Sequence, residues 1–389
     1  MIDVEKLATR ANEELARLIA FDTTSRDSNL DLIVYVEKLL AGLGIASKRV
    51  SNADGTKANL LATIGPMAPG GVVLSGHTDV VPVDGQAWTS DPWVLTQRGD
   101  KLYGRGSSDM KGFIALALAA TPHFVAAGLK KPIHLAWSYD EEIGCLGAPD
   151  LIREIAASVP APAAVIVGEP TGMVAVSGHK GIASYKVTVR GHEAHSSQTH
   201  LGVSANMAAI KLMASLDALA EKLKRDADPA SPYLPKETTL TVGVIHGGTA
   251  GNILARECEF VFDVRTQPGV DTRALIAGFH EEVHAMDKAL KDRFPDAGAH
   301  IETHAINPAL APEPDGPAEA LARRLAGDNG PPRVVPYAAE AGQFQEAGYS
   351  VVICGPGYID QAHQPDEYVE IAQMQRGAAF MARLVESLE

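Results

Sequence analysis

Several segments of the sequence carry a histidine or a carboxylate where an apolar run ends or where a helical pattern begins. Imidazole and carboxylate groups bind divalent cations and transfer protons, so such positions are candidates for a metal centre. Taken singly, each is also compatible with an ordinary surface or core residue. The residues are His77, Asp109, the adjacent pair Glu141 and Glu142, Glu169, and His363.

These groups form a mixed set of nitrogen and oxygen donors without thiolates. Such a set suits zinc, cobalt or manganese and differs from a structural zinc site. One carboxylate can bridge two ions about 3.5–4 Å apart, and a water between two such ions loses a proton near neutral pH. The donor set therefore predicts a centre that could produce a nucleophile for an amide carbonyl.

Two local spacings suggest a division of roles. Glu141 and Glu142 are neighbours that point in different directions, so one can bind metal while the other remains free as a base. His77 and Asp79 are two residues apart in an extended segment and share a face. Asp79 can therefore orient the imidazole of His77.

The elements that must position these groups are short apolar strands separated by helical patterns. This alternation predicts an α/β fold with a mostly parallel sheet, and ligands of such sheets bind beyond the carboxyl ends of the strands. The expected strands span 58–65, 71–77, 131–139, 163–169 and 350–357, and the expected helices span about 3–20, 30–43, 110–128, 316–326 and 371–388.

The middle of the chain has a different pattern. Its strands alternate between apolar and polar residues, which is typical of a sheet with one open face. This predicts a small α+β domain inserted into the larger one. The expected organisation is a first part of the catalytic domain at 1–178, the inserted domain at 179–297 and a second part at 298–389.

Composition restricts the class of protein. The 389 residues carry a formal net charge of −14, which argues against nucleic acid as a partner. The three cysteines form no disulfide or metal-binding pattern. The N-terminus lacks the layout of a signal peptide, and no apolar run is long enough for a membrane span. We therefore expect a cytoplasmic protein without a membrane partner.

Five stretches, in this order, resemble the acetylornithine deacetylase and succinyl-diaminopimelate desuccinylase family of two-metal hydrolases. The resemblance covers most of the chain, including the inserted domain. The stretches are SGHTDVVP (75–82), YGRGSSDMKG (103–112), DEEIG (140–144), VGEPT (167–171) and AHQPDE (362–367).

The resemblance implies two divalent metal ions, with zinc expected and cobalt as an alternative. Asp109 would bridge the ions. His77 and Glu169 would complete one metal site, and Glu142 and His363 would complete the other. The resemblance also makes Asp79 the partner of the His77 ring and Glu141 the general base.

The inserted domain resembles the lid and dimerisation domain of the family, which implies a homodimer. GHEAHSS (191–197) matches its signature, so His195 would enter the neighbouring subunit's site and stabilise the oxyanion. Asn252 and Arg265 match positions that bind the substrate carboxylate, although Arg265 could also be a solvated strand residue.

Three stretches favour the acetylornithine deacetylase branch, namely 109–113, 251–269 and 355–370. The expected reaction is removal of the acyl group from a small N-acyl-L-amino acid, with N-acetyl-L-ornithine as the leading substrate. Succinyl-diaminopimelate, other N-acyl amino acids and peptides are the alternatives, and a non-catalytic binding protein is a further class. The loop that contains Glu340 is expected to shape the pocket for the substrate side chain.

Overall fold

A computed structural model describes residues 2–389, and the chain divides into two compact units. Each unit has its own cluster of buried hydrophobic residues. Unit 1 comprises the residues up to Gly178 together with Leu310–Val334 and Ala339–Glu389, and unit 2 comprises His179–Ala309 and Val335–Ala338.

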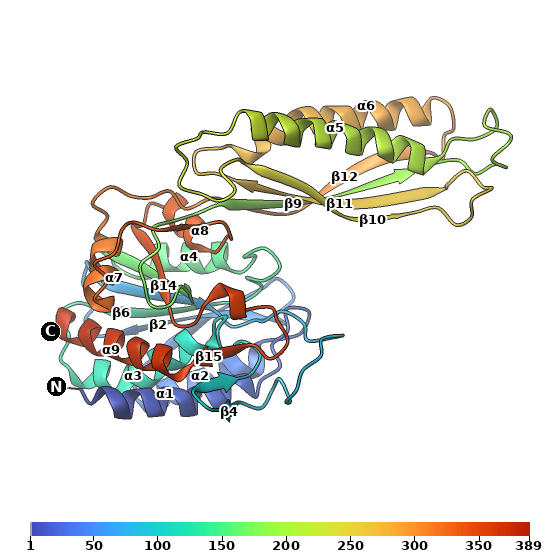
Figure 1. Ribbon diagram of the computed structural model, residues 1–389. Coiled ribbons are helices and arrows are strands. Elements are labelled where there is room, and N and C mark those ends of the chain that lie inside the picture. The colour runs from blue at the N-terminus through green and yellow to red at the C-terminus, as the bar shows by residue number, and fades with distance from the viewer. Residues whose placement is uncertain (1) are drawn as a thin grey trace. The chain divides into compact units, whose positions relative to one another are not determined.

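A six-stranded mixed sheet in the order β1-β2-β6-β3-β7-β14 forms the centre of unit 1 (Figure 1). β6, β3, β7 and β14 run parallel to one another, whereas β2 is antiparallel to both β1 and β6. The predicted α/β class is confirmed. The strands are β1 (Ser47–Ser51), β2 (Ala58–Ile64), β6 (Ile133–Ser138), β3 (Val72–His77), β7 (Ala164–Pro170) and β14 (Val351–Gly355).

Helices cover both faces of this sheet, which explains why its inner strands are buried along their whole length. α3 packs on β3 and β7, and α1 and α9 pack on α3. Figure 1 shows these three helices on one face and α4 and α8 on the other. The helices of unit 1 are α1 (Val4–Ile19), α2 (Leu30–Gly42), α3 (Lys111–Ala126), α4 (Ala148–Ser158), α7 (Pro317–Ala326), α8 (Ala341–Glu346) and α9 (Ile371–Leu388).

A small antiparallel sheet brings two distant segments of unit 1 together. β5 (Lys101–Tyr103) pairs with β4 (Thr96–Arg98) on one side and with β15 (Tyr368–Glu370) on the other. The loop after the short helix η1 (Ile359–Gln361) therefore lies beside the segment that leads into α3. A separate two-stranded sheet joins β8 (Gly178–His179) to β13 (Val334–Val335).

Unit 2 is a four-stranded antiparallel sheet in the order β10-β11-β9-β12 with two helices on one face (Figure 1). Buried and partly exposed residues alternate along β9 and β11, because only one face of the sheet is covered by helices. The elements are β9 (Gly181–Arg190), α5 (Ala205–Arg225), β10 (Thr239–Gly247), β11 (Glu257–Thr266), α6 (Thr272–Lys291) and β12 (Gly298–Asn307).

The end of unit 2 differs from the sequence expectation. The sequence places the boundary at residue 297, whereas unit 2 continues to Ala309. The physical reason is β12, which has no counterpart among the expected strands and which pairs with β9 along its length. Its mixed polar composition, GAHIETHAIN, gives a weak strand signal, because it lies at the edge of a half-exposed sheet.

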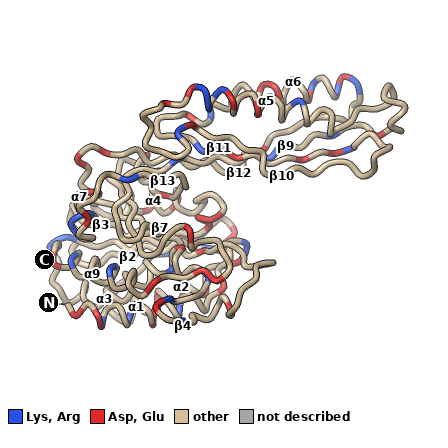
Figure 2. The backbone as a smooth tube through the Cα atoms, viewed as in Figure 1, with Lys and Arg blue, Asp and Glu red and all other residues tan. Residues whose placement is uncertain are grey.

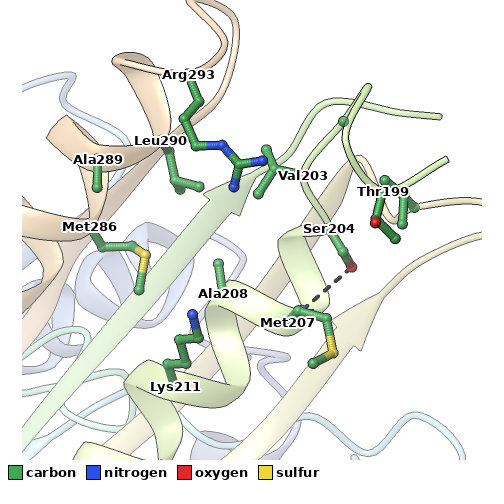
Figure 3. Close-up of a pocket in the computed structure, with 12 residues that line it drawn as sticks. Thr199, Val203, Ser204, Met207, Ala208, Lys211, Met286, Ala289, Leu290 and Arg293 are labelled. Carbon is green, nitrogen blue, oxygen red and sulfur yellow. Dashed lines mark hydrogen bonds between the residues drawn. The ribbon is translucent and has the colours of Figure 1, made fainter. Parts of the chain in front are cut away.

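A hollow of about 330 Å³ opens on unit 2 between α5 and α6. Figure 3 shows Ala208 and Lys211 of α5 facing Met286 and Leu290 of α6 across it. The loop before α5 forms a further wall and ends at Ser204, whose hydroxyl accepts a hydrogen bond from the Met207 amide and caps the helix. The hollow is therefore built entirely from elements of unit 2.

Helices α5 and α6 carry charges of both signs. Figure 2 shows Lys and Arg interspersed with Asp and Glu along these two helices. In the part of the chain that the structure describes, no helix combines the length and the apolar character that a membrane crossing requires.

Candidate metal centre

The strand ends of unit 1 bring the candidate residues to one edge of the sheet. His77 is the last residue of β3, Glu169 lies near the end of β7, and Glu142 follows β6. These strands are adjacent and parallel, so their carboxyl ends meet. Asp109 precedes α3, and His363 follows β14 through η1.

The Asp109 carboxylate lies between two histidines and directs one oxygen toward each. Oδ1 lies 3.0 Å from Nε2 of His77, and Oδ2 lies 3.4 Å from Nε2 of His363. Two further carboxylates flank this arrangement. Nε2 of His363 is 3.0 Å from Oε2 of Glu142, and Nε2 of His77 is 3.6 Å from Oε1 of Glu169. All five candidate ligands therefore lie together, with the Asp109 carboxylate between the two histidines.

In the described part of the chain, two buried carboxylate oxygens of this cluster lack a hydrogen-bond partner, which is consistent with a cation-binding role. Oε1 of Glu142 and Oε1 of Glu169 are buried without a hydrogen-bond partner among the described residues. A buried carboxylate oxygen without a partner is costly, and a cation between these groups would compensate the cost. Among the described residues, two groups of three side chains have donor atoms within 4.8 Å of one another. One group is His77, Asp109 and Glu142, and the other is His77, Glu141 and Glu169.

The ring of His77 is oriented for metal binding. Its Nδ1 lies 2.9 Å from the backbone oxygen of Asp79. Because a carbonyl oxygen only accepts hydrogen bonds, Nδ1 carries a proton and donates it to this oxygen. Nε2 faces Asp109 and donates to its Oδ1 at 3.0 Å, so Nε2 is the nitrogen that would bind a cation once that proton is displaced.

The raised pKa values of Glu142 and His363 indicate that these groups hold protons where cations would bind. Burial and the neighbouring charge of Asp109 raise the pKa of Glu142 to about 7. Hydrogen bonds to Asp109 and Glu142 raise the pKa of His363 to about 10. Burial disfavours ionisation of Asp109, but the hydrogen bonds from His363 and His77 outweigh it and lower the pKa of Asp109. A cation would replace the protons that now neutralise the carboxylates.

The carboxylate of Asp79 has a wider role than the sequence suggested. The contact of Asp79 with the ring of His77 is made by its backbone oxygen, and its Oδ1 lies 3.7 Å from that ring. The carboxylate accepts hydrogen bonds from the backbone amides of Glu141 (3.1 Å) and Glu142 (3.3 Å) and from the hydroxyl of Ser25 (2.7 Å). Asp79 therefore fixes the backbone from which both glutamates project. Ser25 has no signal in the sequence that would have marked it.

Glu141 lies beside the cluster with its own partner. The thiol of Cys145 donates to Oε1 of Glu141 at 3.3 Å. Burial raises the pKa of Glu141 to about 8, so this carboxyl can both take up and release a proton near neutral pH. Asp140, immediately before it, has a φ of 55°, a strained conformation that non-glycine residues rarely adopt and that often accompanies functional sites.

A buried ion pair that sequence reasoning missed holds the loop before Asp109. Oε2 of Glu367 accepts from the guanidinium of Arg105 (2.7 Å) and from the Gly106 amide (3.0 Å). Oε1 accepts from the amides of Ser108 (2.9 Å) and Asp109 (3.0 Å). Arg105 and Glu367 lie inside two of the stretches that carry the family resemblance, and this position was the signal in the sequence that could have marked them. This pair holds the backbone at Asp109 in place.

The carboxylate of Glu340 makes contacts that the sequence did not predict, while the expectation that its loop shapes the substrate pocket stays a prediction. Its carboxylate is buried and accepts hydrogen bonds from the hydroxyls of Ser75 (2.6 Å) and Ser138 (2.8 Å). Ser75 lies on β3, two residues before His77, and Ser138 is the last residue of β6. The side chain of Glu340 therefore supports two strands of the centre and is not free to contact a substrate.

The other three candidate residues lie in unit 2. His195 and Asn252 are exposed and occupy two loops that pair with each other, with an isolated bridge between His195 and Ile253. Arg265 lies on β11, is half-buried, and donates from Nε to Oδ2 of Asp263 at 2.8 Å. The three residues are thus presented on the surface of unit 2.

Comparison with known proteins identifies the family. Residues 73–387 match peptidase family M20/M25/M40. The chain is 34% identical to an acetylornithine deacetylase of Proteus mirabilis (strain HI4320), covering 95% of this chain and 92% of the relative. It is 35% identical to an acetylornithine deacetylase of Myxococcus xanthus, covering 95% of each. The chain therefore belongs to peptidase family M20/M25/M40 and is a hydrolase, which confirms the resemblance inferred from its motifs.

Solved structures share the fold. An M20 family metallo-carboxypeptidase of Sulfolobus solfataricus superposes with a TM-score of 0.77 at 19% identity, covering 97% of this chain and 98% of the other. A dinuclear metal binding peptidase of the M20 family from Bacillus subtilis superposes with a TM-score of 0.66 at 14% identity, covering 99% of both chains. At these identities the likeness shows the α/β fold.

Proposed function

We propose that this hydrolase removes the acyl group from a small N-acyl-L-amino acid, with N-acetyl-L-ornithine as the leading substrate. The observation that carries the proposal is the Asp109 carboxylate, which offers one oxygen to each of two histidines and is flanked by Glu142 and Glu169. The two acetylornithine deacetylases at 34–35% identity over nearly the whole chain support the choice of substrate.

The proposed metal sites share Asp109. His77 and Glu169 would hold one divalent cation and Glu142 and His363 the other, with zinc as the first choice and cobalt as the alternative for this nitrogen and oxygen donor set. When bound, two such cations polarise an amide carbonyl and lower the pKa of water.

Glu141 would carry the proton through the reaction. As the oxygen of water forms a bond to the amide carbon, its proton passes to the carboxylate of Glu141. When the bond between carbon and nitrogen breaks, the same proton passes to the leaving amine, which restores the carboxylate. The pKa of about 8 that burial gives Glu141 matches this exchange near neutral pH.

Residues of unit 2 would bind the substrate. Arg265 has two terminal guanidinium nitrogens beyond the Nε that bonds Asp263, and a guanidinium can pair both oxygens of a carboxylate. Asn252 would assist it with its side-chain amide. His195 would donate a hydrogen bond to the oxygen that becomes negative in the tetrahedral intermediate, and it would do so in the active site of a second copy of the chain.

The surface of unit 2 supports a homodimer through this unit. β10 lies at the edge of the sheet, where unpaired backbone groups can join a second sheet. Val244 and Ile245 of β10 are 44% and 55% exposed. Met207 and Ile210 on α5 are 60% and 52% exposed. Large apolar side chains on an open sheet edge and on the adjacent helix are typical of a protein interface.

Metal analysis combined with a substrate panel tests the proposal. The purified protein is expected to contain about two divalent ions per chain, as in other paired metal sites, and to lose activity with a chelator. Hydrolysis rates are then compared for N-acetyl-L-ornithine, N-acetyl-L-methionine, succinyl-diaminopimelate and a dipeptide. If acetylornithine is cleaved no faster than the others, the substrate assignment is wrong even though the enzyme is a hydrolase.

Mixed dimers test whether active sites are shared. A His195→Ala chain and a Glu141→Gln chain are each expected to be inactive. Their mixture regains activity if His195 serves the site of its partner, because a mixed dimer then contains one complete set of residues. Verified mixed dimers without any activity would contradict sharing between subunits.

A further inference from the structure

The loop that carries His195 contains two neighbouring serines, Ser196 and Ser197, and they make different contacts. The amide of Ser197 donates to Nδ1 of His195 at 3.2 Å, and its hydroxyl lies 2.8 Å from the same nitrogen. The amide of Ser196 instead donates to the backbone oxygen of Asn252 at 2.9 Å, and no hydrogen bond of its hydroxyl occurs within the described residues. Only the second serine therefore acts on the ring.

The contact from the Ser197 amide determines where the ring holds its proton. A backbone N–H group can only donate, so Nδ1 of His195 must accept with its lone pair. A neutral imidazole with an unprotonated Nδ1 carries its proton on Nε2. The hydroxyl of Ser197 then also donates to Nδ1, since no proton on that nitrogen remains for it to accept.

Nearby His192 provides a contrast within the same short segment. Its Nδ1 lies 2.9 and 3.0 Å from the two carboxylate oxygens of Asp296, and its ring stacks on Phe294 with centroids 4.5 Å apart. A carboxylate accepts hydrogen bonds, so Nδ1 of His192 carries a proton. The two histidines of this segment thus have opposite arrangements at Nδ1, and each arrangement follows from the group placed beside it.

The backbone around His195 is fixed on both sides. Ala194 accepts from the amide of Leu254 at 2.9 Å, and the amide of Gln198 donates to the backbone oxygen of His195 at 2.8 Å. Together with the bond from Ser196 to Asn252, these contacts hold the turn in which Ser197 reaches back to the ring. The ring itself is exposed, and within the described residues no hydrogen bond involves Nε2.

We infer that Ser197 is a positioning residue that keeps the proton of His195 on Nε2 and directs this N–H outward as a hydrogen-bond donor. The inference rests on the proposed function, in which His195 stabilises the negatively charged oxygen of the intermediate. A histidine with its proton on Nδ1 would present a lone pair to that oxygen and repel it. Ser197 therefore prepares the catalytic donor without contacting the substrate.

Nuclear magnetic resonance of the histidine rings in the full-length protein tests the position of the proton directly. Long-range correlations between ring protons and ring nitrogens distinguish the two neutral forms, and His192→Gln and His195→Gln variants assign the signals. We expect the proton on Nε2 for His195 and on Nδ1 for His192. A His195 ring with its proton on Nδ1, or with both forms equally populated, would overturn the inference.

Kinetics of serine variants test the consequence. Ser197→Ala removes the hydroxyl bond, and at about 0.5–1.5 kcal/mol for one hydrogen bond we expect kcat to fall about three- to tenfold with KM nearly unchanged. Ser197→Thr keeps a hydroxyl and should restore most of the rate, whereas Ser196→Ala is the matched control and should match the wild type. Ser197→Ala retains the backbone amide bond to Nδ1, so unchanged kcat and an unchanged His195 spectrum in this variant would refute a positioning role of the Ser197 side chain.

The two levels of failure can be separated. Full activity of His195→Ala would remove the proposed catalytic role of His195, and with it the catalytic part of this inference. The ring spectra do not depend on turnover, so they still decide whether Ser197 holds the proton on Nε2. An unaltered His192 signal in the Ser196 and Ser197 variants shows that the fold of the loop is intact.

Discussion

The metal centre of unit 1 and the loops of unit 2 hold their functional side chains in different ways. His77, Asp109 and Glu169 are buried, and Asp109 is fixed by Glu367, a residue more than 250 positions away in the sequence. His195 is exposed, and Ser197, two residues away, holds its ring. The Asp109 carboxylate of the buried cluster is thus held by a long-range contact, whereas His195, which would meet a substrate from outside, is held locally and remains accessible.

The largest effect is expected from the residue that carries the proton in unit 1. Glu141→Gln keeps the shape of the side chain but cannot accept a proton, so kcat should fall by about 10²–10⁴-fold. Metal content should stay at the wild-type value, because the five proposed ligands remain. Steady-state kinetics together with metal analysis check this. Loss of metal along with activity would instead indicate that Glu141 is a ligand, as its proximity to His77 and Glu169 would allow.

The next effect concerns stability. Glu367→Ala leaves the buried guanidinium of Arg105 without its carboxylate and removes four hydrogen bonds, so the free energy of unfolding should fall by about 3–5 kcal/mol. Glu37→Ala is the matched control, because it breaks a partly exposed pair with Arg49 and should cost at most about 1 kcal/mol. Denaturant titration of both variants measures the difference, and equal losses would contradict the special role of the buried pair.

Metal binding should depend on pH through the residues of unit 1 alone. The pKa of His363 is raised to about 10 and that of Glu142 to about 7 in the metal-free protein, so His363 holds a proton below pH 10 and Glu142 below pH 7. A cation must displace these protons. The apparent affinity should therefore rise with pH, by about tenfold per pH unit for each proton displaced.

Calorimetry in buffers of different ionisation enthalpy counts the protons released on metal binding. Between pH 7 and 10 we expect release from His363, and below pH 7 additional release from Glu142. The raised pKa values of His77 and Glu169 add further protons to this count. His195→Ala should give the same proton count as the wild type, because His195 belongs to unit 2 and is not a proposed ligand. Metal binding without proton release would contradict the assignment of His363 as a ligand.

The smallest effect is expected in unit 2. Arg265→Lys replaces a planar fork by a point charge, so KM should rise about fivefold with a smaller change in kcat. Arg190→Lys is the matched control, since Arg190 is also a strand arginine beside a strand carboxylate, Glu257. Equal KM values for the two variants would favour the interpretation of Arg265 as a solvated strand charge.

Much of the fold could be predicted because hydrophobic periodicity is a local property. Helices expected at about 3–20 and 371–388 are found at Val4–Ile19 and Ile371–Leu388, and the apolar strands at 71–77 and 131–139 are β3 and β6. The antiparallel direction of β2 was not predictable in this way, because an apolar run buried on both faces has the same pattern in either direction. β12 was missed because a half-exposed edge strand has little apolar character.

The sequence by itself determined the family, the α/β class and the types of residue available for chemistry, because motif order and apolar spacing are written along the chain. Only the tertiary structure decided which contacts these residues make. It assigned the carboxylate of Asp79 to the amides of Glu141 and Glu142, and that of Glu340 to two serines. It also selected Ser197 over Ser196 as the partner of His195. Whether a hydrogen bond forms depends on differences of a few tenths of an ångström between donor and acceptor. The packing of the folded chain sets these distances.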